Sequence, residues 1–414
     1  MKTNKRNSDI RHIVLRAGFG FSPKSFQLVR NKSLKSVTEL ILDEANFSQP
    51  FQLVPKPAGE TKFNDKMSVN PEDQKKMNKE KQKIMRIEIE QMNRLWLNKM
   101  QDATFGLNEK MTLFWHGHFA CRVENSYFMQ EYYNVLNANA VGNFADLLFA
   151  VSKTPAMLQF LNNQQNKKAH PNENFAREVM ELFTLGHGNY SESDIKESAR
   201  AYTGWGFNNT GEFIFREKQH DEGSKRFLGN TGNYTGDDIL NFILIQPQTA
   251  VLISEKIYRF FVNENPDDKI INILANNFRK CKYNIKTLLE DIFTANWFYL
   301  PENKGNLIKS PVELLSNIMR VNSITVQTPE VYYQFQKLLG QILFNPPNVA
   351  GWKGGTSWID SSSLMLRMRL PEIFYYDKEF MAQAKVDGAD LDADFYNAQR
   401  TQERQNDNYL KKYR

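Results

Sequence analysis

The chain has 414 residues, of which 41% are hydrophobic and 24% charged, as is ordinary for a folded globular protein. Lys and Arg number 53 against 47 Asp and Glu, and because the basic residues are interleaved with acidic ones, the net charge of +6 argues against a nucleic-acid partner. Two cysteines are too few for a disulfide framework, and no run of about 20 apolar residues predicts a membrane span.

Apolar residues recur at helical spacing along most of the chain, which predicts a mostly α-helical, multi-helix globular array. The predicted helices begin with one that starts at Ser22-Pro23 and continue with 36–45, 71–103, 109–118, 126–139, 142–151, 154–162, 172–185, 191–203, 237–245, 247–263, 267–280, 284–295, 309–321, 329–340 and 361–377. Residues 1–380 are expected to form a single domain, with 236 as the best place for a sub-boundary, followed by a polar tail over 381–414.

Two segments, 204–236 and 46–70, are predicted to be non-helical. Residues 204–236 contain seven glycines and are predicted to be an irregular insert, in which Phe213–Phe215 forms one strand of a short hairpin. Residues 46–70 are predicted to be a surface loop, and the Lys-rich start of the helix over 71–103 a solvated face rather than an interaction site.

Five of the six histidines lie between residues 116 and 220. His116 and His118 flank Gly117 at the predicted end of a helix. Because residues i and i+2 of a helix point roughly 200° apart, the pair can share a ligand if the helix ends there. The pair is interpreted either as metal ligands or an acid/base pair, or as one buried, hydrogen-bonded histidine and one histidine at a helix end.

The helix over 172–185 carries an apolar stripe (Phe175, Val179, Leu182) beside a polar one (Asn174, Glu178, Glu181). A buried Glu178 needs an arginine or a metal as partner, so this helix is a candidate wall of a site. The alternative is a solvent-facing ladder of ion pairs, in which Glu173 and Arg177 pair at i, i+4.

Two further segments add candidate residues. Ser191 and Asp194 form a capping box that starts a helix, and Arg200 on that helix is placed to pair with Glu178 or Glu181 or to bind an anion. His220-Asp221, followed by Lys225, lies in the Gly-rich insert and is interpreted as a ligand pair, a general base or a turn.

Taken together, several segments resemble the bacterial family known as domain of unknown function 1800, collinearly over residues from about 12 to 370. They are Arg16–Gly20, Phe114–Phe119, Asn172–Glu178, Ala199–Trp205, His220-Asp221 with Lys225 and Leu228-Gly229, Lys309–Glu313 and Pro347–Trp352. The resemblance implies no established activity, but it gives more weight to a site shared by His116, His118, Glu178, Arg200 and His220.

The resemblance also bears on where the protein acts. Many family members look exported and stand beside a second uncharacterised family that is similar to sulfatases and phosphatases. This chain departs from them, because its N-terminal segment lacks the apolar run of an export signal. As written, it is expected to be cytoplasmic, and export is the alternative that the resemblance implies.

Two hypotheses follow. The first is a metal- or acid/base-dependent enzyme of hydrolytic type, with catalytic groups His220, Asp221, Glu178, Arg200 and Arg177, and with His116, His118, Glu178 and His220 holding zinc, iron or manganese. The second is a non-enzymatic helical binding or assembly protein for a glycan or protein partner. It rests on the three tryptophans in Gly-rich loops, which are otherwise core residues (Trp205, Trp352, Trp358).

Overall fold

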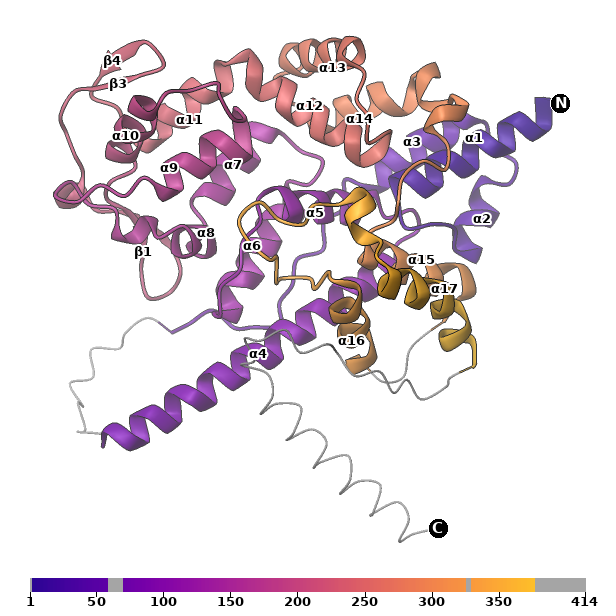
Figure 1. The fold of residues 1–414 in the computed structure, drawn as a ribbon, viewed down its shortest axis with the longest axis horizontal. Coiled ribbons are helices and arrows are strands. Elements are labelled where there is room, and N and C mark those ends of the chain that lie inside the picture. Colours follow the sequence, from indigo (N-terminus) through magenta and orange to yellow (C-terminus); the bar gives the residue numbers. More distant parts are fainter. Residues whose placement is uncertain (1, 59–69, 325–328, 377–414) are drawn as a thin grey trace, which may run out of the picture. The chain divides into compact units, whose positions relative to one another are not determined.

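The computed structural model describes residues 2–58, 70–324 and 329–376, and in these the chain is mostly α-helical, as predicted (Figure 1). The first part of the chain contains α1 (Lys2–Ala17), α2 (Pro23–Val29), α3 (Leu34–Glu44), α4 (Pro71–Asp102), α5 (Leu107–His118), α6 (Ser126–Ala138), α7 (Phe144–Ser152), α8 (Pro155–Phe160) and the 3-10 turn η1 (Asn163–Gln165). Of these, α1 is absent from the predicted helices.

The middle of the chain carries the described strands. It contains α9 (Asn174–Glu178), the π-helix η2 (Val179–Thr184), α10 (Glu192–Ala201), β1 (Trp205–Phe207), β2 (Phe213–Phe215), the 3-10 turn η3 (Glu217–Gln219), β3 (Lys225–Phe227), β4 (Asn230–Gly232) and α11 (Gly236–Ile245). The predicted hairpin is confirmed, because β1 and β2 pair antiparallel with Gly206 opposite Ile214. A second hairpin, β3–β4, fills the rest of the Gly-rich insert.

The last part is helical again. It contains α12 (Pro247–Phe261), α13 (Asp268–Lys280), α14 (Ile285–Thr294), the 3-10 turns η4 (Asn296–Tyr299) and η5 (Pro301–Asn303), α15 (Pro311–Asn322), α16 (Pro329–Leu339), the 3-10 turn η6 (Gly355–Trp358) and α17 (Ser361–Tyr376). No helix in the described ranges combines the length and the apolar composition that crossing a bilayer requires.

Local capping signals explain where several helices start. Ser22 caps α2 with Pro23 in the first turn, and Ser191 and Asp194 form the predicted capping box at α10. Ser310 and Glu313 form a third such box at α15. These side chains satisfy backbone N–H groups that the first turn of a helix leaves without partners.

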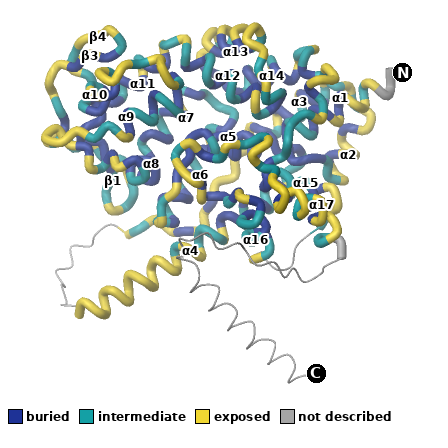
Figure 2. Tube along the Cα trace, viewed as in Figure 1, coloured by how far each residue is buried: buried dark blue, intermediate teal, exposed yellow. Residues whose placement is uncertain are grey.

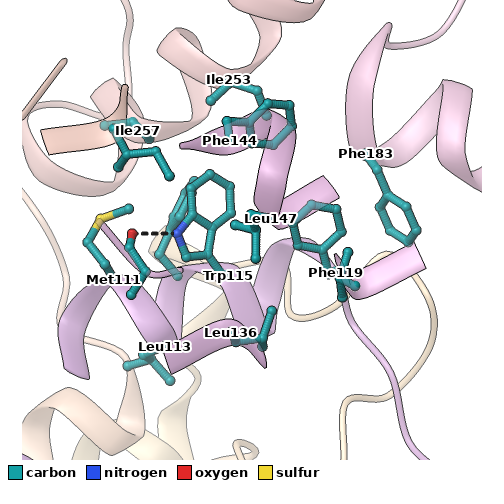
Figure 3. Packing of buried hydrophobic residues seen from close by; sticks show 14 of the residues in the cluster. Met111, Leu113, Trp115, Phe119, Leu136, Phe144, Leu147, Phe183, Ile253 and Ile257 are labelled. Carbon is teal, nitrogen blue, oxygen red and sulfur yellow. Dashed lines mark hydrogen bonds between the residues drawn. The ribbon is translucent and has the colours of Figure 1, made fainter. Parts of the chain in front are cut away.

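The core is organised around α5, in which every residue from Leu107 to His116 is buried. The indole of Trp115 lies among Phe144 of α7 and Ile257 of α12 and donates a hydrogen bond to the Ala140 carbonyl at 2.8 Å (Figure 3). A helix buried on all sides must also satisfy its polar residues. Glu109 does so by accepting hydrogen bonds from Trp96 (2.8 Å) and from a tyrosine and an asparagine of α6.

The outer half of α4 is exposed, whereas its second half is buried against the core (Figure 2). The Lys-rich start of this helix is therefore solvated, as predicted. Residues 59–69 of the loop expected before it lie outside the described residues.

Residues Met1–Pro371 form one compact unit, which continues across residue 236, and Glu372–Arg414 form a second unit. Of the second unit, residues 372–376 at the end of α17 are described, and the predicted tail over 381–414 lies outside the described residues. Cys121 and Cys281 are both free thiols.

Candidate functional site

His116 faces away from solvent at the end of α5. Its Nε2 accepts a hydrogen bond from the backbone N–H of Phe344 at 3.0 Å, and its ring meets the ring of Trp352 edge-on at 5.5 Å. Complete burial lowers its pKa to about 3, so the imidazole is neutral near pH 7. His116 thus fits the interpretation as a buried, hydrogen-bonded histidine, and it anchors the segment that follows α16.

Gly117 and Gly351 bring that segment directly against α5 (Figure 1). Gly351 has φ +72°, and a Cβ built on it would lie 2.3 Å from the Gly117 carbonyl oxygen. A residue with a side chain is therefore excluded at position 351 by both backbone conformation and space. We call residues 345–358 the Trp352 loop.

His118 points the other way, toward η2 and α12. Its Nε2 donates to the Phe183 carbonyl at 3.1 Å, and its Nδ1 accepts a hydrogen bond from Lys256 Nζ at 3.2 Å. Burial, with Lys256 nearby, lowers the pKa of His118 well below 6.5, which keeps the ring neutral and able to accept from an ammonium group.

The carbonyl groups that accept hydrogen bonds from His118 and Lys256 belong to the π-helix η2. The wider turn ends with Leu185 and Gly186 both donating to Met180, which leaves the Leu182 and Phe183 carbonyls free for side chains. It also shifts the buried stripe that the sequence predicts, because Phe183 is buried while Leu182 is half-buried. Lys256 Nζ donates a hydrogen bond to the Leu182 carbonyl at 2.8 Å.

Lys256 is the titratable group of this arrangement. Burial lowers its pKa from 10.5 to about 8. An ammonium group has three N–H donors, and two of them are used by Leu182 and His118. The side chain also lines a cavity, so its third donor is available to a molecule bound there.

That cavity has a volume of about 660 Å³ and lies beside α5. Its walls come from the end of α1, from α5, from the second half of α12, from the start of α15 and from the Trp352 loop. Four of the segments that carry the family resemblance meet here, contributing Arg16, Phe114, Lys309 and Trp352. We call this cavity the α5 pocket.

The α5 pocket is strongly cationic. Of the described side chains that line it, six carry a positive charge (Arg16, Lys110, Lys256, Arg259, Lys309, Lys353) and two a carboxylate (Glu264, Glu313). In its deeper part, Lys110 and Glu313 form a buried ion pair, with 5% and 14% of their side chains exposed. Although burial acts to raise the pKa of Glu313, Lys110 and Ser310 hold it below its usual value.

Two further cations share the environment of that single ion pair. Arg16 donates to the Asn303 carbonyl at 2.9 Å, and burial lowers its pKa to about 10. Burial and the adjacent Lys110 lower the pKa of Lys309, whose Nζ makes no hydrogen bond with the described residues. Three cations that line the pocket therefore interact electrostatically with Glu313: Lys110 through the ion pair, and Arg16 and Lys309 through its charge.

Aromatic rings form the rest of the lining. Trp352 and Trp358 come from the Trp352 loop, Phe19 from the turn after α1, and Phe114 and Phe260 from α5 and α12. Lys110 lies 5.4 Å from the Phe19 ring centre and 5.2 Å from that of Phe260, which adds cation–π stabilisation to its ion pair. Trp205, in contrast, is a core residue, 3% exposed.

The other predicted site residues lie elsewhere. Arg177 pairs on the surface with Glu173 at 3.3 Å, as predicted, and with both oxygens of Glu192. Glu178 is half-buried and makes no hydrogen bond or ion pair with the described residues. Burial and neighbouring Glu181 raise its pKa.

Of the two roles predicted for Arg200, pairing with Glu178 or Glu181 and binding an anion, the first is not observed. Arg200 instead clamps Asp221 through two hydrogen bonds, of 2.7 and 3.1 Å, because the Gly-rich insert folds back over α10. His220 Nδ1 bonds the Thr203 carbonyl at 2.9 Å, and the buried Lys225 donates to backbone carbonyls of the same loop. These contacts fix the loop.

The structure does not bring the four predicted metal ligands together. Each of the three histidines has a different contact: His116 faces the Trp352 loop, His118 faces Lys256, and His220 faces Thr203. Glu178 contacts none of these groups through a hydrogen bond or ion pair among the described residues. Among the described residues, no group of three or more His, Cys, Asp or Glu side chains is placed to hold a metal ion. The predicted ligands therefore do not fit a shared metal site.

The sequence interpretation missed the cations of the α5 pocket. Arg16 and Lys309 lie in segments already noted for the family resemblance, and Lys256 is a lone lysine on the apolar side of its helix. The available signal was that pattern of isolated cations next to apolar residues. Their positions, up to 293 residues apart in the chain from Arg16 to Lys309, hid their convergence.

The fold and the α5 pocket define a mostly helical protein with a cationic, partly aromatic cavity built from distant segments. A family model described as "Protein of unknown function (DUF1800)" matches residues 12–412, nearly the whole chain, and the protein belongs to this family. No curated protein and no solved structure shows a significant match to the chain.

Proposed function

We propose that the α5 pocket is the active site of an acid/base enzyme that acts on a small anionic substrate. The observation that carries the proposal is the cluster of Arg16, Lys110 and Lys309 around the single carboxylate of Glu313. Glu178, Arg200 and His220, which the sequence favoured, have no part in it.

The charge balance of this cluster favours an anionic ligand. Charges removed from water are costly unless they are paired, and here one carboxylate is shared by three cations. A bound phosphate, sulfate or carboxylate group would neutralise the excess and would give Lys309 the hydrogen-bond acceptor that the described residues do not provide. Arg16 and Lys309 are the residues we expect to contact it.

Lys256 supplies the acid/base function in this proposal. A group with a pKa of about 8 exchanges protons readily near neutral pH, which suits a general acid or base in hydrolysis. His118 is a positioning residue, since it holds the Lys256 ammonium through Nδ1 while its own Nε2–H is fixed by Phe183. This is the acid/base form of the enzyme hypothesis.

The non-enzymatic alternative uses the same pocket, and Trp352 and Trp358 favour it, because aromatic rings are typical of glycan-binding surfaces. The two functions predict different effects of replacing Lys256. In an enzyme, Lys256→Met abolishes turnover with a small change in affinity, whereas in a binding protein it changes affinity alone.

Isothermal titration calorimetry with inorganic phosphate and with sulfate tests the proposal. We expect both anions to bind the wild-type protein, and Lys309→Met to weaken binding about tenfold, the effect of losing about 1.4 kcal/mol. Lys196→Met, at an exposed lysine of α10 far from the pocket lining, serves as the control and should bind as the wild type does. Absence of anion binding to the wild type, or equal weakening by both substitutions, would refute it.

A further inference from the structure

We infer that the ligand of the α5 pocket is an anionic carbohydrate, a sugar ring that carries a phosphate, sulfate or carboxylate group. This inference rests on the proposed function and adds the chemical class of the molecule to which the anion belongs. It depends on three features of the lining other than the cations.

The first feature is a pair of tryptophans on one segment. Trp352 and Trp358 both line the pocket and are both partly exposed. The C–H groups of a sugar ring form an apolar face that packs against an indole, a preferred arrangement for a side chain with an apolar body and a polar edge. Trp352 is held in place by the edge-on ring of His116, so its side chain is ordered before a ligand arrives.

The second feature is a set of neutral and acidic hydrogen-bonding groups, which match hydroxyls rather than a second anion. The Glu264 carboxylate lies against Gly355 of the Trp352 loop, with Oε1 2.8 Å from the place of a Cβ on that glycine. It makes no hydrogen bond with the described residues and can accept from hydroxyl groups. Gln341 uses its Oε1 to accept from Val312 N–H at 3.0 Å, which leaves its amide nitrogen to donate.

The third feature is the distribution of these groups over the fold. The cations Arg16, Lys110 and Lys309 come from the end of α1, from α5 and from the segment just before α15, and the Trp352 loop supplies both tryptophans. A ligand with one charged group and one ring bearing hydroxyls uses both kinds of lining at once. The volume of about 660 Å³ is within the range of pockets for small organic molecules.

A planar aromatic anion would also pack on tryptophan, but it would leave Glu264 and the Gln341 amide without partners. Polar groups that a ligand covers without pairing cost binding free energy, so the pocket favours a ligand that has hydroxyls. This difference separates the two ligand classes experimentally.

The experiment compares four probes by calorimetry on the full chain, namely inorganic phosphate, glucose 6-phosphate, glucuronate and phenyl phosphate. We expect at least one of the two anionic sugars to bind about tenfold more tightly than phosphate and than phenyl phosphate. In Trp358→Ala this advantage is lost, while the affinity for phosphate changes by less than about twofold. Trp358→Phe should restore part of the advantage, which distinguishes lost stacking from misfolding.

Trp297→Ala removes a partly exposed tryptophan that does not line the α5 pocket and should keep the sugar advantage. If phosphate binds but neither sugar exceeds it, or if phenyl phosphate binds as tightly as the better sugar, the carbohydrate inference fails and the anion site stands. If none of the four probes binds, the proposed function fails with it.

Discussion

Two opposing effects act on the protonated form of Lys256. Its two hydrogen bonds, to the Leu182 carbonyl and to His118, favour the ammonium form, while burial disfavours it. Because both acceptors are uncharged, burial prevails and the pKa falls to about 8. A carboxylate in place of His118 would instead keep the lysine permanently charged, which would suit a structural ion pair better than proton transfer.

The lowered pKa of Lys256 predicts a pH dependence of stability. Between about pH 8 and pH 10.5 the unfolded chain keeps a proton on this lysine that the folded protein has released, so the free energy of unfolding rises with pH there. The gain for a single group is at most about 3.5 kcal/mol, at about 1.4 kcal/mol per pH unit. Below pH 8 both states are protonated, and the contribution no longer changes.

Urea unfolding at pH 7.5, 9 and 10.5 measures this effect in the wild type and in Lys256→Met. We expect the wild type to gain stability relative to the variant over this range, whatever their difference at pH 7.5. Lys269→Met, at an exposed position of α13, controls for general effects of removing a lysine and should parallel the wild type. Parallel curves for wild type and Lys256→Met would show that Lys256 titrates as an ordinary lysine.

Two elements, η2 and the Trp352 loop, contact the two histidines at the end of α5. η2 turns the Leu182 and Phe183 carbonyls toward Lys256 and His118, and the loop carries Trp352 against His116. His116 contacts Trp352 and His118 contacts Lys256, two residues that line the α5 pocket, and the two rings point apart because residues i and i+2 lie roughly 200° apart on a helix.

Helix starts were predictable at this scale, and the π-turn was not. Capping at Ser22, Ser191 and Ser310 depends on residues three apart in the sequence, so local patterns suffice. The π-turn in 179–184 depends instead on partners outside the segment, since Lys256 and His118 take the carbonyls that it exposes. Propensity within the segment favoured an uninterrupted α-helix over 172–185.

The Trp352 loop yields a prediction through Gly351. Gly351→Ala combines the strain of φ +72° with a clash against the Gly117 carbonyl, so the loop must move away from α5. We expect a loss of about 2–4 kcal/mol in the free energy of unfolding, or a detached loop with weaker ligand binding. Gly305→Ala has the same φ and open space around the Cβ, and should cost about 1–2 kcal/mol without affecting binding.

Denaturant unfolding and phosphate titration of both glycine variants measure the two effects. A smaller effect of Gly351→Ala than of Gly305→Ala on both quantities would contradict the contact between the Trp352 loop and α5.

At the scale of the whole molecule, the pocket is assembled from segments that lie far apart in the chain. The N-terminal helix supplies Arg16, the central helix Lys110, and segments beyond residue 300 supply Lys309 and Glu313. The sequence identified several of these segments as belonging together through the family resemblance, yet it placed the site on His116, Glu178 and His220. In the folded protein the three histidines make hydrogen bonds to backbone groups, and cations that are isolated in the sequence line the pocket together.

The buried pair of Lys110 and Glu313 links α5 to α15 and gives the last prediction. Glu313→Gln removes the carboxylate and leaves Lys110 buried without its partner, and breaking such a pair typically costs about 3–5 kcal/mol. Because the remaining positive charge is uncompensated, a bound divalent anion should restore part of the loss. Glu39→Gln, which breaks an exposed pair on α3, should cost less than about 1 kcal/mol.

Thermal unfolding in sodium sulfate and in sodium chloride of equal ionic strength separates a bound anion from general screening. We expect sulfate to raise the Tm of Glu313→Gln more than chloride does, and more than it raises the Tm of the wild type. A sulfate concentration of about 100 times Kd would contribute about 2.7 kcal/mol through binding to the folded state. Equal shifts in the two salts would mean that the protein neutralises this cluster without a ligand.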